Sequence, residues 1–129
     1  MYKTPINIVK NRAYLELRGK LSETDLQTWA DDAVVQFRRL LTGFSVVSDI
    51  PDCEPANEAG RQIIQTLQRT AKEKGMGEVV RITKGANPIT ANQWQRSSRA
   101  VGYTAGEAAT VAEADALLDQ ASPGQEGHA

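Results

Sequence analysis

The chain has 129 residues, which is enough for one compact domain and too few for two domains of ordinary size. Its 15 basic and 16 acidic side chains give a formal charge of -1, so no overall positive field draws it to nucleic acid or to an anionic membrane. Hydrophobic residues make up 40% of the sequence and aromatic residues only 5%, a composition that excludes general disorder and predicts an aliphatic core.

The chemistry-bearing residues are few. One cysteine, Cys53, and one histidine, His128, exclude an intramolecular disulfide and a zinc site built from such ligands. His128 stands beside the C-terminus, so we set aside catalysis that depends on histidine. Neither a glycine loop for nucleotides nor a long apolar run occurs, and we therefore expect no cofactor, no membrane insertion and a cytoplasmic protein.

The first predicted elements are a hairpin, a helix and a buried strand. Apolar and polar residues alternate at 6–8 and 13–18 on either side of a turn at 10–12, which predicts two antiparallel strands. Ser22 and Asp25 have the spacing of a helix cap, and apolar residues then recur at helical spacing up to Gly43. This stripe contains Leu26, Trp29, Ala30, Ala33, Phe37, Leu40 and Leu41. The β-branched run 44–50 stops at Pro51 and predicts a parallel strand near the middle of a sheet.

The second half alternates helices and strands. After a loop at 52–55, apolar spacing predicts a helix through 63–71 that ends at the cations and glycine of 72–75, followed by a strand at 78–83. Asn87 and Pro88 suit the start of a third helix. Its apolar face would consist of Ile89, Gln93 or Trp94, and Ala100 or Val101. A short edge strand within 103–109 and a last helix complete the series. That helix would start at Thr110 and Glu113 and carry Val111, Ala114, Leu117 and Leu118.

The order of these elements predicts an α/β domain. Strands that alternate with helices form a mainly parallel sheet, here with about five strands, about four helices and an antiparallel hairpin at the N-terminus. We expect this single domain to cover residues 1–120, and 121–129 to form a flexible tail with little to bury.

Specific residues in this order resemble the STAS domain family, named for sulfate transporters and anti-sigma factor antagonists. Residues 17–21, Leu-Arg-Gly-Lys-Leu, resemble the family's "x-G-x-L" before helix one, and 46–50 resemble its strand "v-v-l-D-l". The family's "D-S-S-G" then falls without a gap on Asn57-Glu58-Ala59-Gly60, where only the glycine is retained. The resemblance covers approximately residues 6–119 and implies the STAS fold, of the anti-sigma factor antagonist-like kind.

The departure from this motif shapes the functional expectation. In many bacterial signalling regulators of the family the first serine is phosphorylated, whereas Glu58 stands there and has no hydroxyl. The resemblance implies a non-enzymatic regulatory or scaffolding module that binds a switch kinase, an anti-sigma factor or a second copy of itself. The expected partner-binding residues are Asp52, Cys53, Asn57, Glu58, Ala59 and Gly60. The simpler interpretation is that Glu58 is a stabilising acid in the first helical turn and Asn57 a helix cap.

Alternatives of other classes remain open at this stage. A related α/β fold could serve as a small-molecule or lipid carrier, which requires an aliphatic pocket of a few hundred cubic ångströms. The loop acids Asp49, Asp52, Glu54 and Glu58 could hold a cation or a basic partner, act as a general acid and base, or be merely solvated. Cys53 could be a reactive thiol or an inert small side chain.

One further cluster is basic. Arg81, Lys84, Arg96 and Arg99 accompany Trp94 in the second half of the chain. Cations interleaved with an aromatic residue could hold single-stranded nucleic acid or dock a protein, although a solvated helix face with a packed tryptophan is the simpler interpretation. We therefore expect no nucleic-acid partner.

Overall fold

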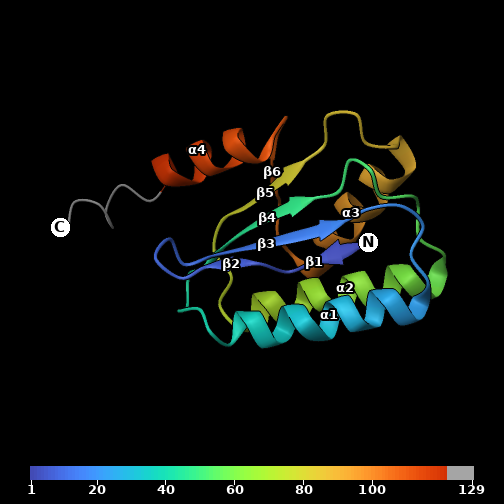
Figure 1. Cartoon of the computed structure of the whole chain (residues 1–129), viewed down its shortest axis with the longest axis horizontal. Coiled ribbons are helices and arrows are strands. Elements are labelled where there is room, and N and C mark those ends of the chain that lie inside the picture. The colour runs from blue at the N-terminus through green and yellow to red at the C-terminus, as the bar shows by residue number, and fades with distance from the viewer. Residues whose placement is uncertain (122–129) are drawn as a thin grey trace.

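The computed structural model describes residues 1–121, which form one sheet and four helices (Figure 1). The strands are β1 (Tyr2–Lys3), β2 (Ile6–Asn7), β3 (Arg12–Leu17), β4 (Ser45–Asp49), β5 (Val79–Ile82) and β6 (Gly106–Ala108). The helices are α1 (Glu23–Phe37), α2 (Glu58–Glu73), α3 (Pro88–Val101) and α4 (Val111–Ala121). Ala121, which we expected in the tail, is the last residue of α4, and the rest of the expected tail lies outside the described residues.

The sheet is mainly parallel and β4 lies at its centre. Its strand order is β1-β3-β4-β5-β6, with β2 also paired to β3. β3, β4, β5 and β6 run parallel, while β1 and β2 pair antiparallel with β3. The N-terminal strand is split because Pro5 has no N–H to donate, although its carbonyl still accepts from Tyr14 N at 2.9 Å. The predicted α/β class, hairpin and central strand are confirmed.

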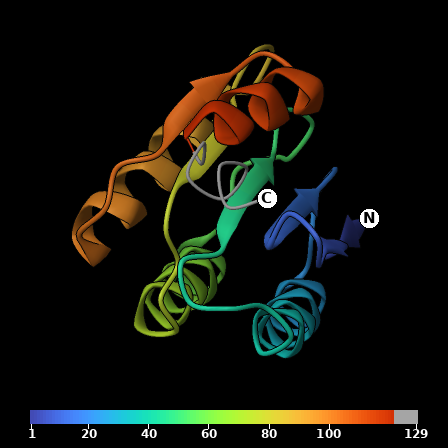
Figure 2. The ribbon, with the colours of Figure 1, turned by 90° about the vertical axis from the view of Figure 1, so that its left-hand side faces the viewer.

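The helices cover the two faces of the sheet unequally. The α1, α2 and α3 helices pack on one face, where the larger core contains Trp29, Phe37, Phe44 and Trp94, and α4 alone lies on the other (Figure 2). Alternate residues of β4 divide between the faces, since Val46 joins the larger core and Val47 the smaller one. Trp29 is fully buried, as its place in the apolar stripe predicted.

The first helix starts as predicted and ends earlier. Ser22 and Asp25 form a capping box in which the Ser22 hydroxyl accepts from Asp25 N at 3.0 Å. The helix ends at Phe37, and Leu41, which we placed on its apolar stripe, is 76% exposed. The reason is a long-range contact, because Asn11 in the hairpin turn binds both the N–H and the carbonyl of Leu41, at 2.8 and 3.1 Å.

The third helix begins at Asn87 and Pro88 as predicted, but a different face is buried. Ile89 is 60% exposed, and the buried residues are Thr90, Trp94, Ser97 and Ser98. Small hydroxyl side chains let the helix approach its neighbours closely while their oxygens bond to nearby carbonyls. The Thr90 hydroxyl, for example, donates to the Cys53 carbonyl at 2.9 Å.

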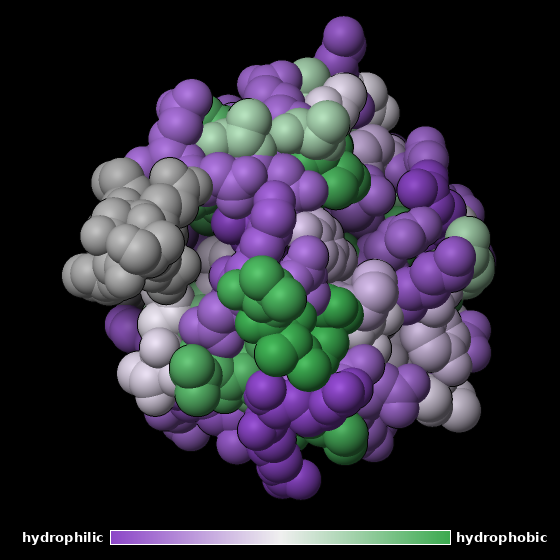
Figure 3. Space-filling view, turned by 60° about the vertical axis from the view of Figure 1, so that its left-hand side comes forward, coloured by the Kyte–Doolittle hydropathy of each residue, from purple (hydrophilic) through white to green (hydrophobic). Residues whose placement is uncertain are grey.

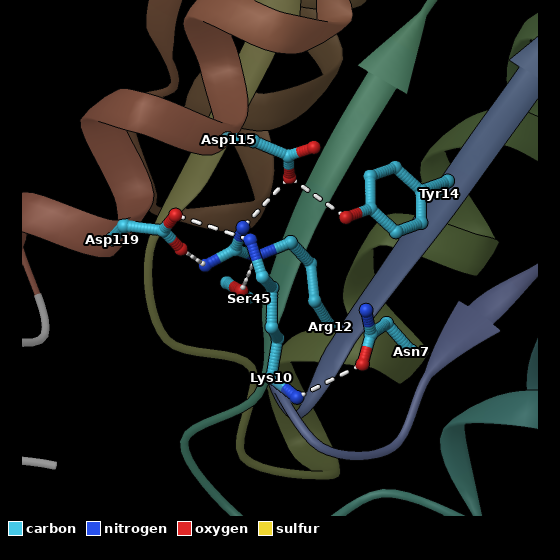
Figure 4. A network of polar contacts seen from close by, with 7 residues as sticks. All are labelled: Asn7, Lys10, Arg12, Tyr14, Ser45, Asp115 and Asp119. Carbon is cyan, nitrogen blue, oxygen red and sulfur yellow. Dashed lines mark hydrogen bonds and ion pairs between the residues drawn. The ribbon is translucent and has the colours of Figure 1, made fainter. Parts of the chain in front are cut away.

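A polar network fixes α4 to the sheet (Figure 4). The buried Arg12 guanidinium donates to Ser45 Oγ at 2.9 Å, to Asp115 Oδ1 at 2.7 Å and to Asp119 Oδ1 at 3.0 Å. The Tyr14 hydroxyl donates to the same Asp115 oxygen at 2.7 Å. All three nitrogens of this guanidinium are therefore paired, which compensates for its burial.

Apolar side chains also gather on the surface at the turn between β2 and β3 (Figure 3). Ile8 and Val9 are 58% and 96% exposed, and Leu41 is bonded to the same turn. The helical pattern had placed Leu41 on the apolar stripe of the first helix, which is wrong, whereas Ile8 was expected only in an alternating hairpin segment. Among the helices of residues 1–121, none combines the length and apolar character that crossing a membrane requires.

Candidate functional site

The loop between β4 and α2 is anchored on one side by the turn that follows β3. Gly19 N donates to the Asp52 carbonyl at 2.7 Å, and Glu54 N donates to the Gly19 carbonyl at 3.0 Å. Gly19 has a positive φ of 76°, a conformation that glycine adopts without strain. The family-like "x-G-x-L" segment therefore acts here as a backbone support for the loop at the carboxyl end of the central strand.

The first turns of α3 support the same loop from the other side. In addition to the Thr90 bond to the Cys53 carbonyl, Gln93 donates to the Ala56 carbonyl at 2.8 Å and accepts from Ala56 N at 2.9 Å. One amide side chain thus satisfies both polar groups of a loop residue. Backbone atoms of the loop are thus bonded to the rest of the fold on two sides.

The helix that follows the loop begins where the resemblance placed it. Asn57 is the N-cap of α2, and its Oδ1 accepts from Gly60 N at 2.8 Å. Glu58 is the first helical residue, with its side chain 65% exposed. It forms an ion pair with Arg61 one turn along and accepts from Gln62 Nε2 at 3.4 Å. A carboxylate here meets the positive end of the helix dipole, so the predicted setting of Glu58 is confirmed.

The retained glycine of the motif has a packing role. Gly60 is buried, and a Cβ there would lie 2.9 Å from Leu26 Cδ1 and 3.0 Å from Ala56 Cβ. The missing side chain lets α1 approach the start of α2, while Ala59 beside it is half-buried. Of the six expected partner-binding residues, only Asp52, Asn57 and Glu58 carry exposed side chains.

Cys53 does not offer its thiol to a partner or a substrate. It is 6% exposed, and its Sγ lies 3.4 Å from the Glu54 carbonyl. Burial and the nearby Glu54 carboxylate raise the pKa of the thiol to about 11, whereas a nucleophilic cysteine needs a depressed one. The hypothesis of a reactive thiol at this position is wrong, and only the backbone of Cys53 takes part in the loop.

Two of the four loop acids, Asp49 and Asp52, are held by an arginine rather than gathered around a cation site. Arg18 forms ion pairs with Glu16 at 2.6 Å, with Asp49 at 3.5 Å and with Asp52. Within residues 1–121 no three His, Cys, Asp or Glu side chains are grouped to hold a metal ion. Burial raises the pKa of Asp49, and the neighbouring acids add to this while Arg18 opposes it. Sequence reasoning missed Arg18, although it stands inside the "x-G-x-L" segment.

The basic residues of the second half do not form one surface. Arg81 is buried in β5, while Arg96 and Arg99 project from α3 into different hollows. Trp94 is 2% exposed, packed edge-on against Trp29, and offers no face on which a base could stack. The simpler interpretation of a packed tryptophan is confirmed.

Two hollows beside α2 differ in character. A groove of about 400 Å³ between α2 and α3 begins at Glu58 and Arg61 and includes the exposed Ile89 and Arg96. A cavity inside the core, between Trp29, Gln68 and Trp94, measures about 10 Å³. This cavity has space for one water molecule, not for an acyl chain, so it does not supply the pocket that the carrier alternative requires.

The mainly parallel sheet, its N-terminal hairpin and the anchored strand-end loop have the arrangement of a STAS-like fold. No family model matches the sequence, and no curated protein sequence does. Among solved structures, the chain is similar to a variant of RsbS from Moorella thermoacetica in which a serine is replaced by glutamate. That structure has a TM-score of 0.64 at 15% sequence identity, and the match covers 94% of this chain and 98% of that one. The likeness confirms the STAS-like, anti-sigma factor antagonist-like fold.

Proposed function

We propose that this chain is a non-enzymatic regulatory module of the anti-sigma factor antagonist type, which binds a protein partner through the β4–α2 loop and the first turn of α2. The observation that carries the proposal is the exposed carboxylate of Glu58 at the start of a capped helix, on a loop held from both sides. A preformed surface loses little conformational freedom on binding, which favours recognition by another folded protein.

Glu58 sets the mode of regulation in this proposal. Because Glu58 has no hydroxyl that a serine kinase could phosphorylate, the surface keeps a fixed carboxylate where similar domains gain and lose a phosphate group. The partner therefore meets a constant surface, and control of the complex comes from the partner or from the amount of this chain. A surface that is not altered by phosphorylation suits a scaffolding role, in which the chain holds its partner at all times.

The charge around the loop indicates the kind of partner. Glu16, Asp49 and Asp52 share the single guanidinium of Arg18, so this edge of the sheet keeps an excess of negative charge. A protein with a basic recognition surface complements it, whether a switch kinase, an anti-sigma factor or a second copy of this chain. The α2–α3 groove adds an apolar contact at Ile89, whose exposed side chain gives the partner an anchor beside the charge.

The test separates charge from shape at Glu58. The tagged chain is used to capture partners from a lysate of its own organism, and the affinity of each captured protein is then measured with purified variants. We expect Glu58→Asp to retain binding, and Glu58→Gln to lower the association rate by about threefold or more, because a rim charge acts mainly on encounter. Glu73→Gln, at the other end of the same helix and also exposed, is the matched control.

Two outcomes decide the proposal. Binding that responds to Glu58→Gln and to Ile89→Asp, but not to Glu73→Gln, supports the surface described here. A captured partner whose affinity is the same for all three variants refutes it. Native mass spectrometry of the purified chain tests the carrier alternative separately. A lipid that remains bound would contradict the conclusion that the core cavity is too small to hold an acyl chain.

A further inference from the structure

A second arginine is buried in the sheet, and its environment contrasts with that of Arg12. Arg81 occupies the third position of β5 and is 5% exposed, on the face that α3 covers. Its guanidinium carbon lies 5.6 Å from the centre of the Trp94 ring, a cation–π contact that covers one side of the group. In the interior strand of a parallel sheet such a position is ordinarily apolar.

The guanidinium of Arg81 is not satisfied within the described part of the chain. Arg12 is paired through all three of its nitrogens, whereas Nε and Nη2 of Arg81 have no hydrogen-bond partner among residues 1–121. Burial lowers the pKa of Arg81, against the opposing influence of Tyr103 and Glu107, yet an arginine stays charged in proteins. Two donors without a partner on a buried guanidinium are costly for stability, which marks Arg81 as a candidate for binding.

The side chain borders the largest hollow among those described. This hollow, which we call the Arg81 pocket, lies between α3 and the β5–β6 edge and has a volume of about 640 Å³. Its walls include Arg81, Gln95, Arg99, Tyr103, Thr104 and Glu107. The volume is in the range of sites for small organic molecules, and the walls combine charged groups with hydrogen-bonding amide and hydroxyl groups.

The charges of the pocket indicate the ligand. Arg81 at the base and Arg99 at the rim face one acid, Glu107, so positive charge is in excess. Nε and Nη2 of Arg81 are closed to solvent, so the buried guanidinium would meet a carboxylate or a phosphate in the pocket through Nη1, and the exposed Arg99 guanidinium would donate to it from the rim. We propose that the Arg81 pocket binds a small molecule through such an oxyanion group, with Arg81 as the buried anchor and Arg99 as a second contact. This site adjoins the α2–α3 groove, with which it shares Asn92, and does not depend on the proposed partner surface.

Nuclear magnetic resonance on the full chain tests the proposal with two probes, inorganic phosphate and citrate. The observed quantity is the shift of the Arg81 Nε–H resonance and of the Trp94 indole resonance during each titration at low salt. We expect saturable shifts with at least one probe, and the stronger probe identifies the ligand as a phosphate or a carboxylate. Glu107→Gln, which removes the opposing acid, should tighten binding by about two- to fivefold.

Three variants locate the site. Arg81→Met keeps much of the side-chain length without the charge and should weaken binding at least about tenfold. Because this variant lacks the Arg81 resonance, its affinity is measured from the shift of the Trp94 resonance. Arg99→Gln on the exposed rim leaves the core intact and should weaken it about two- to fivefold. Arg96→Gln, on the same helix but in the neighbouring groove, is the control and should leave binding unchanged. No saturable shift with either probe, or equal affinities of Arg99→Gln and Arg96→Gln, overturns the proposal.

Discussion

The polar network under α4 allows a quantitative prediction for Asp115→Ala. This change removes the acceptor shared by Arg12 Nη1 and the Tyr14 hydroxyl, each 2.7 Å away. A hydrogen bond to a charged group contributes about 1.5–3 kcal/mol and a neutral one about 1 kcal/mol. Two effects reduce the loss of stability. Water reaches the Asp115 side chain, which is 27% exposed, and alanine has a higher helix propensity than aspartate by about half a kcal/mol. We expect a net destabilisation of about 2–3 kcal/mol.

Urea denaturation measures this loss directly. Because the slope for a domain of this size is about 1–3 kcal/mol/M, the midpoint should fall by about 0.7–3 M while the slope stays constant. Asp32→Ala, an exposed acid on α1, is the control and should change stability by less than about 0.5 kcal/mol. In an Arg12→Met background the cost of Asp115→Ala should shrink by more than about 1 kcal/mol. Equal midpoints for Asp115→Ala and Asp32→Ala would falsify the assigned role of the network.

Three further predictions follow from buried or paired groups. Cys53 should react with iodoacetamide near pH 8 at least about a hundredfold more slowly than free cysteine, because its pKa of about 11 leaves little thiolate; a rate close to that of free cysteine contradicts this. Gln68→Met should raise the urea midpoint, since both amide atoms of the buried Gln68 lack a hydrogen-bond partner within residues 1–121; a lower midpoint argues against it. Lys10 and Arg12 lower the pKa of Asp119 in the folded state, so this carboxylate contributes stability that is present above the unfolded value and lost as pH falls through the folded one. In Asp119→Asn the free energy of unfolding should therefore fall less steeply below about pH 4 than in the unaltered chain. The same pH dependence in both proteins would show that Asp119 does not contribute to the acid sensitivity.

The order and type of the elements could be predicted because each has its own local cause. Alternation marked the hairpin, a capping box marked the start of α1, and Pro51 marked the end of the β4 segment. The start of α2 at Glu58 was also predictable, from the alignment of a short motif with the loop length. Periodicity and turn residues act over a few positions, and such features are visible in a single sequence.

What could not be predicted depends on contacts between distant residues. The end of α1 is set by Asn11, thirty positions from Leu41 in the chain, and no local pattern contains that bond. Both buried arginines were missed because charged residues ordinarily lie at the surface. Arg12 finds its acids more than a hundred residues away, and Arg81 belongs to a pocket formed by three stretches of the chain. The burial of Cys53 likewise follows from the packing around its loop.

The β4–α2 loop is anchored through its main chain, so its conformation does not depend on the identity of its exposed side chains. Every anchoring bond from Gly19, Thr90 and Gln93 ends on a main-chain atom of the loop, and none uses a loop side chain. The exposed positions at Asp52 and Glu58 are thus at liberty to diverge during evolution without loss of the platform that displays them. Substitutions at these exposed positions would change the groups on the surface and leave the hydrogen bonds that hold the loop in place.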